Sequence, residues 1–197
     1  MLTLKKTILN TIIVTSLTLI STDNVFASTI DIKTEIKEAK TISKIFVTSL
    51  KAELKKAMVS GGPIKAIEVC NTKAIPITQK IAKSHNIQLS RVSLKNRNPD
   101  NKPNDWQQSI LKSFDSRAAK RENIKTIMFS EIAEHNGKKQ FRFMKAIPTG
   151  DGCLVCHGTN IAPIVQEKLA TLYPKDKAIG YEKGQIRGAI VITKELN

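Results

Sequence analysis

Residues 124–147, IKTIMFSEIAEHNGKKQFRFMKAI, decide the fold class. Two strand-like runs, 124–133 and 139–147, flank His135-Asn136-Gly137. Asn-Gly between such runs is a strong signal for the tight turn of a β-hairpin. The stretch therefore predicts two adjacent antiparallel strands.

The segments before the hairpin have helical periodicity. Apolar residues at three- and four-residue spacing predict a long helix over 30–60, which Gly61-Gly62-Pro63 ends. A second helix is predicted over 64–84, with a kink or a break at Pro76. The other predicted elements are a strand over 87–94, a helix over 106–119 capped by Asp105, a helix over 161–172 and a strand over 186–193. This order predicts an α+β domain with a small antiparallel sheet and a helical extension at its N-terminus.

The composition is that of a folded chain. Its 197 residues fit one domain, or one domain with an extension, and 41% hydrophobic residues are enough for a core. Three cysteines are an odd number, which excludes a framework in which every cysteine forms an internal disulfide. No apolar run of about 18 residues follows position 30, so no internal transmembrane helix is predicted.

The first residues predict export. Lys5 and Lys6 precede an apolar stretch over 8–20, and Val25-Phe26-Ala27 supplies the small residues that signal peptidase accepts. We expect cleavage after Ala27, a signal peptide over 1–27 and a periplasmic location. The alternative is an uncleaved anchor.

The basic charge belongs to the exported part. Removing Lys5, Lys6 and Asp23 with the signal peptide lowers the net charge from +15 to +14. Export argues against a nucleic-acid partner, and the lysines are scattered rather than gathered in one run. A solvated basic surface is therefore favoured over a dedicated polyanion site.

Cys153-Leu154-Val155-Cys156-His157 is a C-x-x-C-H sequence, the signature of covalent haem attachment. Two thiols three positions apart can add to the two vinyl groups of one porphyrin, and His157 can then bind the iron as its proximal ligand. Gly152 and Gly158 leave the backbone room beside a large flat ring. The motif predicts one covalent haem c per chain, which export supports because bacteria attach haem outside the cytoplasm.

Two other chemistries use paired cysteines. A thioredoxin-type dithiol normally starts a helix directly after a strand, whereas Pro148, Gly150 and Gly152 predict a loop before Cys153. A zinc site needs about four ligands, and the chain has no second paired motif. Haem c is the favoured interpretation.

The motif uses two of the three cysteines and leaves Cys70. This residue is either a small buried hydrophobe on its helix or the sixth, distal ligand of the iron. Met144, nine residues before the motif, is an equally good distal candidate from the residues alone. The less favoured candidates are His85, His135, Met58 and Met128.

Several segments beyond the haem motif carry a family resemblance. They are 66–71 (AIEVCN), 91–99 (RVSLKNRNP), Asn101 with Pro103 and Trp106, 141–145 (FRFMK), 173–174 (YP), 176–178 (DKA), 180–181 (GY) and 184–189 (GQIRGA). Together they resemble the exported monohaem c-type, PAS-like sensor family, whose members also occur as input domains of bacterial signalling proteins. The resemblance covers nearly the whole exported chain.

The resemblance implies a PAS-like antiparallel sheet with one covalently bound haem c. It implies His157 as the proximal ligand and favours Cys70 over Met144 as the distal one. We accordingly expect an N-terminal helix over 28–62 and a PAS-like haem c domain over 63–197. Ala146 departs from the family pattern, in which proline is expected at this position.

Polar residues in these blocks are candidates for binding the haem propionates through charge-assisted hydrogen bonds, and Arg97 is the first of them. Their alternative role is loop chemistry and helix capping. The others are Arg91, Asn98 and Trp106, while Tyr181 and Arg187 belong either to the pocket edge or to the closing strand.

Three functions are compatible with such a site. The first is a periplasmic sensor of redox state or of a diatomic gas, which signals by contact with a partner. The second is a soluble monohaem electron carrier that docks an acidic redox partner. The third is a haem peroxidase, but no histidine or acidic block is placed as a distal catalyst, so no enzyme is expected. The expected partners are a redox or signalling protein, a diatomic ligand and a second copy of the chain, and not nucleic acid.

Overall fold

The computed structural model describes residues 31–196. The signal peptide predicted over 1–27 lies outside these residues. Within the described part, no helix is both long enough and apolar enough to cross a membrane.

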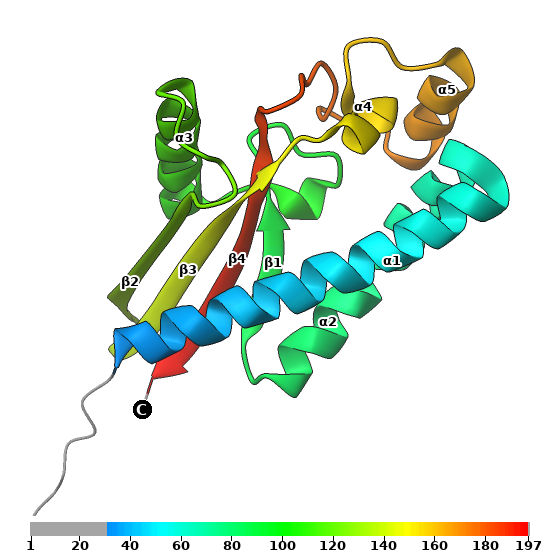
Figure 1. Cartoon of the computed structure of the whole chain (residues 1–197). Coiled ribbons are helices and arrows are strands. Elements are labelled where there is room, and N and C mark those ends of the chain that lie inside the picture. The colour runs from blue at the N-terminus through cyan, green and yellow to red at the C-terminus, as the bar shows by residue number, and fades with distance from the viewer. Residues whose placement is uncertain (1–30, 197) are drawn as a thin grey trace, which may run out of the picture.

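Four strands form one antiparallel sheet in the order β1-β4-β3-β2 (Figure 1). Their bounds are Gln88–Val92 for β1, Met128–His135 for β2, Lys138–Pro148 for β3 and Ile186–Leu196 for β4. The last strand lies between β1 and β3 and so joins the first half of the chain to the hairpin. With helices against both faces, the fold is PAS-like and confirms the predicted α+β class.

The predicted hairpin is confirmed. β2 and β3 pair as far as His135↔Lys138, and Asn136 and Gly137 between them have φ values of 53° and 73°. Both values lie in the left-handed region that a two-residue hairpin turn requires. β2 begins at Met128, later than predicted, because residues 123–127 form a turn in which Thr126 donates its amide hydrogen to the Asn123 carbonyl.

Ala146, where the resemblance predicts proline, lies inside β3. Its amide nitrogen donates a hydrogen bond of 3.1 Å to the carbonyl oxygen of Ile127. Proline has no amide hydrogen and could not make this bond. The alanine therefore connects the strand to the turn that precedes β2.

Helices α1 (Ile32–Thr72) and α2 (Ala74–Ser84) cover one face of the sheet (Figure 1). As predicted, the glycine pair interrupts α1, since Gly62 has a φ of 65° and non-helical backbone. The helix predicted over 64–84 is in two pieces, as expected, but the predicted position of the break at Pro76 is wrong. The break lies at Lys73, and Pro76 falls in the first turn of α2, where a backbone amide hydrogen has no helical acceptor anyway.

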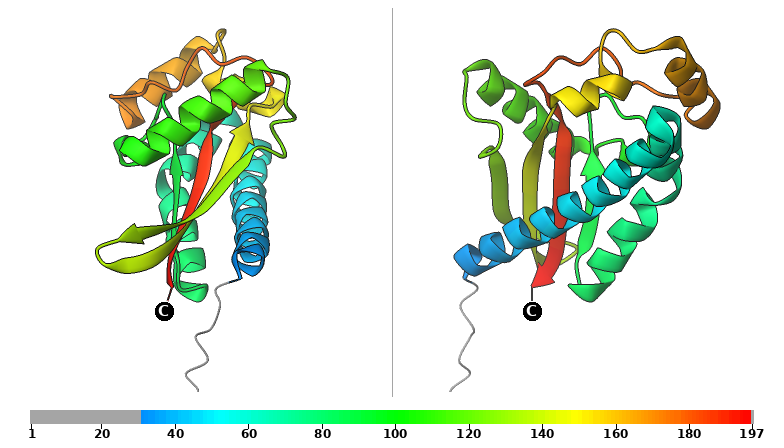
Figure 2. Two further views of the ribbon diagram at one scale, coloured as in Figure 1. Left: turned by 90° about the vertical axis from the view of Figure 1, so that its left-hand side faces the viewer. Right: turned by 45° about the vertical axis from the view of Figure 1, so that its right-hand side comes forward.

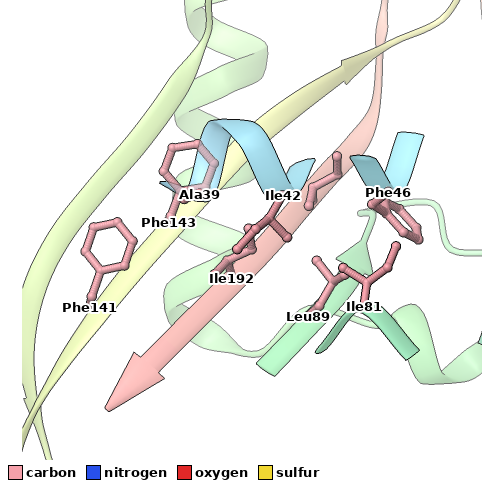
Figure 3. Close-up of a cluster of buried hydrophobic side chains, with 9 residues drawn as sticks. Ala39, Ile42, Phe46, Ile81, Leu89, Phe141, Phe143 and Ile192 are labelled. Atoms are coloured by element: carbon pink, nitrogen blue, oxygen red, sulfur yellow. The ribbon is translucent and has the colours of Figure 1, made fainter. Parts of the chain in front are cut away.

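One hydrophobic core joins α1 and α2 to the sheet (Figure 3). Its fully buried centre includes Ile42 and Phe46 of α1 and Phe143 of β3. The helix predicted as an N-terminal extension thus packs on the same core as the sheet. The domain boundary between residues 62 and 63 stays a prediction. The remaining buried members of the core are Ala39, Ile81, Leu89, Phe141, Ile190 and Ile192.

Helix α3 (Asp105–Ala119) covers the opposite face of the sheet (Figure 2). Its cap is Asn104 and not Asp105 as predicted. The Asn104 side chain accepts the amide hydrogen of Gln107 at 3.1 Å, and the Gln107 side chain accepts that of Asn104 at 3.0 Å. This reciprocal pair places the cap one residue earlier and turns Asp105 into the first helical residue.

Two short helices lie at one end of the sheet, beside the second segment of α1 (Figures 1 and 2). They are α4 (Asp151–His157), which contains the C-x-x-C-H sequence, and α5 (Pro163–Leu172). A 3-10 turn, η1 (Pro99–Asn101), follows β1. The long connection from α5 to β4 returns past α4, and the candidate site forms where these segments meet.

Candidate functional site

The C-x-x-C-H sequence lies on α4 and starts almost directly after β3. Only Thr149 and Gly150 separate the end of the strand from the helix, so the predicted loop before the motif is wrong. The strand reaches Pro148 because β3 pairs with β4 as far as Ile186. This placement resembles that of a redox dithiol, but β3 runs antiparallel to both of its neighbours and there is no βαβ unit.

His157 is held by a single backbone carbonyl. Its Nδ1 lies 2.7 Å from the carbonyl oxygen of Ala178, and because a carbonyl only accepts, Nδ1 carries the hydrogen. The ring also meets Tyr181 edge-on, with 6.3 Å between ring centroids. The other nitrogen, Nε2, therefore keeps its lone pair for a metal ion.

The surroundings of His157 keep its imidazole neutral. Burial, the largest cause, and the positive charges of Arg187 and Arg97 together lower the pKa of His157 to about 3. The hydrogen bond to Ala178 opposes these effects on the pKa only in part. A neutral imidazole with a fixed tautomer is the form that binds a metal.

Arg97 connects three parts of the site. Its Nε donates to the Asp176 carboxylate at 2.9 Å, and its Nη2 donates to the carbonyl oxygens of Cys156 and Ala178. Asp176 in turn accepts the amide hydrogen of Ala178 at 2.7 Å. The guanidinium predicted to bind a propionate is thus engaged with protein acceptors, and it fixes the end of α4 against the segment that orients His157.

The Cys70 thiol lies in the last turn of α1, near the motif. Burial raises the pKa of this thiol, and the positive charges of Arg91, Arg97 and Arg187 offset part of the rise in pKa. Burial also raises the pKa of Cys156, against the effect of Arg97, and the nearby Cys70 and Cys153 thiols add to that rise in pKa. The structure therefore brings Cys70, both motif cysteines, His157 and Arg97 together.

An apolar cluster supports this arrangement from one side. Cys156 packs against a cluster that joins Ile67 of α1 to Val165 and Leu169 of α5. Ile67 precedes Cys70 by three positions on the same helix, so both residues lie on one side of α1. The packing of α5 thereby sets where the second segment of α1, and with it Cys70, meets α4.

Two further arginines converge on the same place. Arg91 comes from β1 and Arg187 from the start of β4, and each affects the pKa of both Cys70 and His157. The sequence predicts Arg91 as a candidate propionate ligand, and Arg187 as a residue either of the pocket edge or of the closing strand. Their convergence could not be seen there because the pairing of β1 with β4 creates it.

Other candidate residues lie away from the site. Met144 is fully buried in the cluster under α3, on the sheet face opposite α1, because Phe143 occupies the α1 side and neighbours alternate along a strand. Trp106 also belongs to the α3 side, where the guanidinium carbon of Arg142 lies 5.1 Å from its ring centroid. Asn98 caps η1 by accepting the amide hydrogen of Asp100 at 3.0 Å. The histidines His85 and His135 lie at the end of α2 and at the end of β2.

The donors fit a porphyrin better than a bare metal ion. Residues 31–196 contain no group of three histidine, cysteine or acidic side chains that could hold an ion. Cys153 and Cys156 instead lie on one side of a helix, three positions apart, and His157 offers one ring nitrogen. Two thiols three positions apart and one imidazole that can bind the iron are the side chains that a haem c needs.

Comparisons with known proteins agree with this architecture. A family model described as Tll0287-like matches residues 5–194. The chain is also similar to a solved structure, that of the cyanobacterial heme-protein Tll0287, with a TM-score of 0.61 and 24% sequence identity. The similarity covers 83% of this chain and 96% of that one, and at such identity it shows the fold alone. No curated protein matches the chain.

Proposed function

The chain belongs to the Tll0287-like family, and from this premise we propose that it is an exported c-type haem protein that senses redox state or a diatomic gas. The observation that carries the proposal is the hydrogen bond of 2.7 Å from His157 Nδ1 to Ala178, next to two cysteines on the same helix. It leaves Nε2 ready to bind iron. The heme protein with the similar fold supports the same cofactor.

Cys153 and Cys156 attach the porphyrin in this proposal. Each thiol would add across one vinyl group of the porphyrin, with its sulfur on one vinyl carbon and its hydrogen on the other. His157 would hold the iron through Nε2, and Arg97 keeps the end of α4 in place through the Cys156 carbonyl. When bound, the haem supplies a one-electron couple and an iron that can take a small gas.

Cys70 is the distal ligand in this proposal. As a thiolate it stabilises ferric iron, so the reduction potential is expected to be low compared with that of cytochromes with a methionine ligand. Ferrous iron carries less positive charge than ferric iron and would therefore favour the neutral thiol. A neutral thiol binds ferrous iron weakly, so reduction is expected to release Cys70 and open a position for nitric oxide or carbon monoxide.

Absorption and EPR spectra of the ferric and ferrous protein test this function. We expect a covalent haem, a six-coordinate low-spin ferric state of thiolate type, and rapid uptake of carbon monoxide by the ferrous form. A chain exported under conditions of haem attachment that carries no haem contradicts the proposal. A ferrous form that does not bind carbon monoxide contradicts the gas-sensing part of the proposal.

Electron transfer is the second candidate function, and the charge around the site favours it. The net charge is +15. Four exposed lysines lie in the segments that follow β1 and precede β4, next to the site: Lys95, Lys175, Lys177 and Lys183. Such a surface would dock an acidic redox partner, with an association rate that falls as salt rises. Rapid electron exchange with six-coordinate iron in both oxidation states would favour the carrier over the sensor.

A further inference from the structure

The site carries more positive charge than the protein neutralises. Three guanidinium groups, those of Arg91, Arg97 and Arg187, act on the same Cys70 and His157. Among the described residues, one carboxylate pairs with them, that of Asp176 with Arg97. The other two guanidinium groups, those of the half-buried Arg91 and Arg187, are therefore left without a carboxylate partner in the described part of the chain.

Arg187 has an unused donor. Its Nη1 donates to the Ser93 hydroxyl at 3.0 Å and to the Lys95 carbonyl at 3.3 Å, and its guanidinium carbon lies 5.1 Å from the Tyr181 ring centroid. Its Nε is buried and finds no acceptor in the part of the chain that the structure describes. A buried donor without an acceptor costs stability, so such an atom points to a group that binds there.

Arg91 is even less engaged. Its guanidinium carbon lies 5.7 Å from the ring centroid of Phe46, over the aromatic face. Within residues 31–196 its side chain takes part in no hydrogen bond or ion pair, although burial is strong enough to lower its pKa. The planar fork of an arginine is suited to a carboxylate, which can accept two of its hydrogens at once.

We propose that Arg91 and Arg187 form an anion site that receives the two propionate carboxylates of the haem. This inference rests on the proposed function. Two guanidinium groups without a carboxylate partner match the two negative charges of the porphyrin, whereas Arg97 is already satisfied by Asp176 and two carbonyls. Arg97 thus positions α4, and the other two arginines would hold the propionates.

The test compares a haem that has its carboxylates with one that lacks them. The full chain with Cys153→Ala and Cys156→Ala binds haem without thioether bonds, so its affinity can be measured. The probes are ferric protoporphyrin IX and its dimethyl ester, whose propionates are uncharged. We expect the free acid to bind at least about tenfold more tightly than the ester, and Arg91→Gln or Arg187→Gln to remove most of that preference.

A matched control is Arg142→Gln. Arg142 is half-buried, pairs with Glu131 and lies over Trp106 on the α3 side, so its loss should leave the preference for the free acid unchanged. Arg91→Gln should also lower the melting temperature of the haem-loaded chain and not that of the haem-free chain, because only the former contains a carboxylate that loses its partner.

Three results would overturn the inference. The first is equal affinity for the free acid and the ester in the chain that keeps all its arginines, a result that counts even where the arginine variants fail to fold. The second is a preference for the free acid that remains in both Arg91→Gln and Arg187→Gln. The third is an equal shift of melting temperature in Arg91→Gln with and without haem. Failure of every chain to bind either porphyrin would instead overturn the proposed function.

Discussion

His157 Nδ1 lies 2.7 Å from the carbonyl oxygen of Ala178, a residue 21 positions later in the chain. Ala178 is fully buried, and its own amide hydrogen is accepted by Asp176 at 2.7 Å. The orientation of the predicted iron ligand thus depends on a loop segment that an arginine and a carboxylate fix in place. Each link in this chain of contacts can be tested separately.

Asp176→Asn should destabilise the fold by about 3–5 kcal/mol, because it leaves the guanidinium of Arg97 buried without its counter-charge. Urea unfolding measures the change. The control is Glu195→Gln, since the Lys138–Glu195 pair is exposed and its loss should cost less than about 1 kcal/mol. Similar losses for the two variants would show that the buried pair is not a structural anchor.

Cys70→Ala should change the ferric spectrum from the thiolate type and leave the haem attached. Met144→Ala should leave the spectrum unchanged and cost about 2–5 kcal/mol of stability, because Met144 is fully buried in the core under α3. Absorption, EPR and thermal unfolding of both variants distinguish the two roles. An altered spectrum for Met144→Ala with an unaltered one for Cys70→Ala would reverse the assignment of the distal ligand.

Cys153→Ser with Cys156→Ser should yield a chain whose haem is lost under denaturing conditions, because both thioether bonds are absent. Haem staining of a denaturing gel measures retention. Cys70→Ser is the matched control, since it also removes one thiol of the site but no thioether, and it should keep the stain. A stained band for the double variant contradicts covalent attachment through α4.

Glu68 connects α1 to α5 through Lys168 at 2.8 Å and also pairs with Lys65 at 3.1 Å. Hydrogen bonds with these lysines hold the pKa of Glu68 below its ordinary value of 4.5. A lowered pKa contributes stability above the ordinary value, and this stability is lost as pH falls through the lowered one. Wild type should therefore be slightly more stable than Glu68→Gln near pH 6, and the two should converge in acid. A difference in denaturant midpoint that does not depend on pH would contradict this.

Local signals in the sequence were sufficient for much of the fold. The Asn136-Gly137 turn and the Gly61-Gly62 interruption follow from backbone freedom that neighbouring residues cannot override. The errors are also local. The sequence predicts an interruption at Pro76, whereas the first turn of a helix tolerates proline and the two pieces meet at Lys73. It predicts Asp105 as the cap, whereas Asn104 makes the reciprocal bond with Gln107. Asn104 and Asp105 compete for the cap, and the reciprocal bond with Gln107 selects Asn104.

The C-x-x-C-H sequence alone marks Cys153, Cys156 and His157 as one chemical unit, since the spacing of its donors is set by covalent geometry within one helical turn. Everything that surrounds the unit comes from pairing and packing across long separations. The β1–β4 pairing brings Arg91 near Arg187, and the return of the chain past α4 gives His157 the carbonyl of Ala178. The sheet's alternation puts Met144 on the far side, while the cluster of α5 residues joins Ile67 of α1 to Cys156. Spacing along the chain determines which side chains within a few residues can bind one group together. The burial and the charge balance of those side chains depend on distant residues that only the folded sheet brings close.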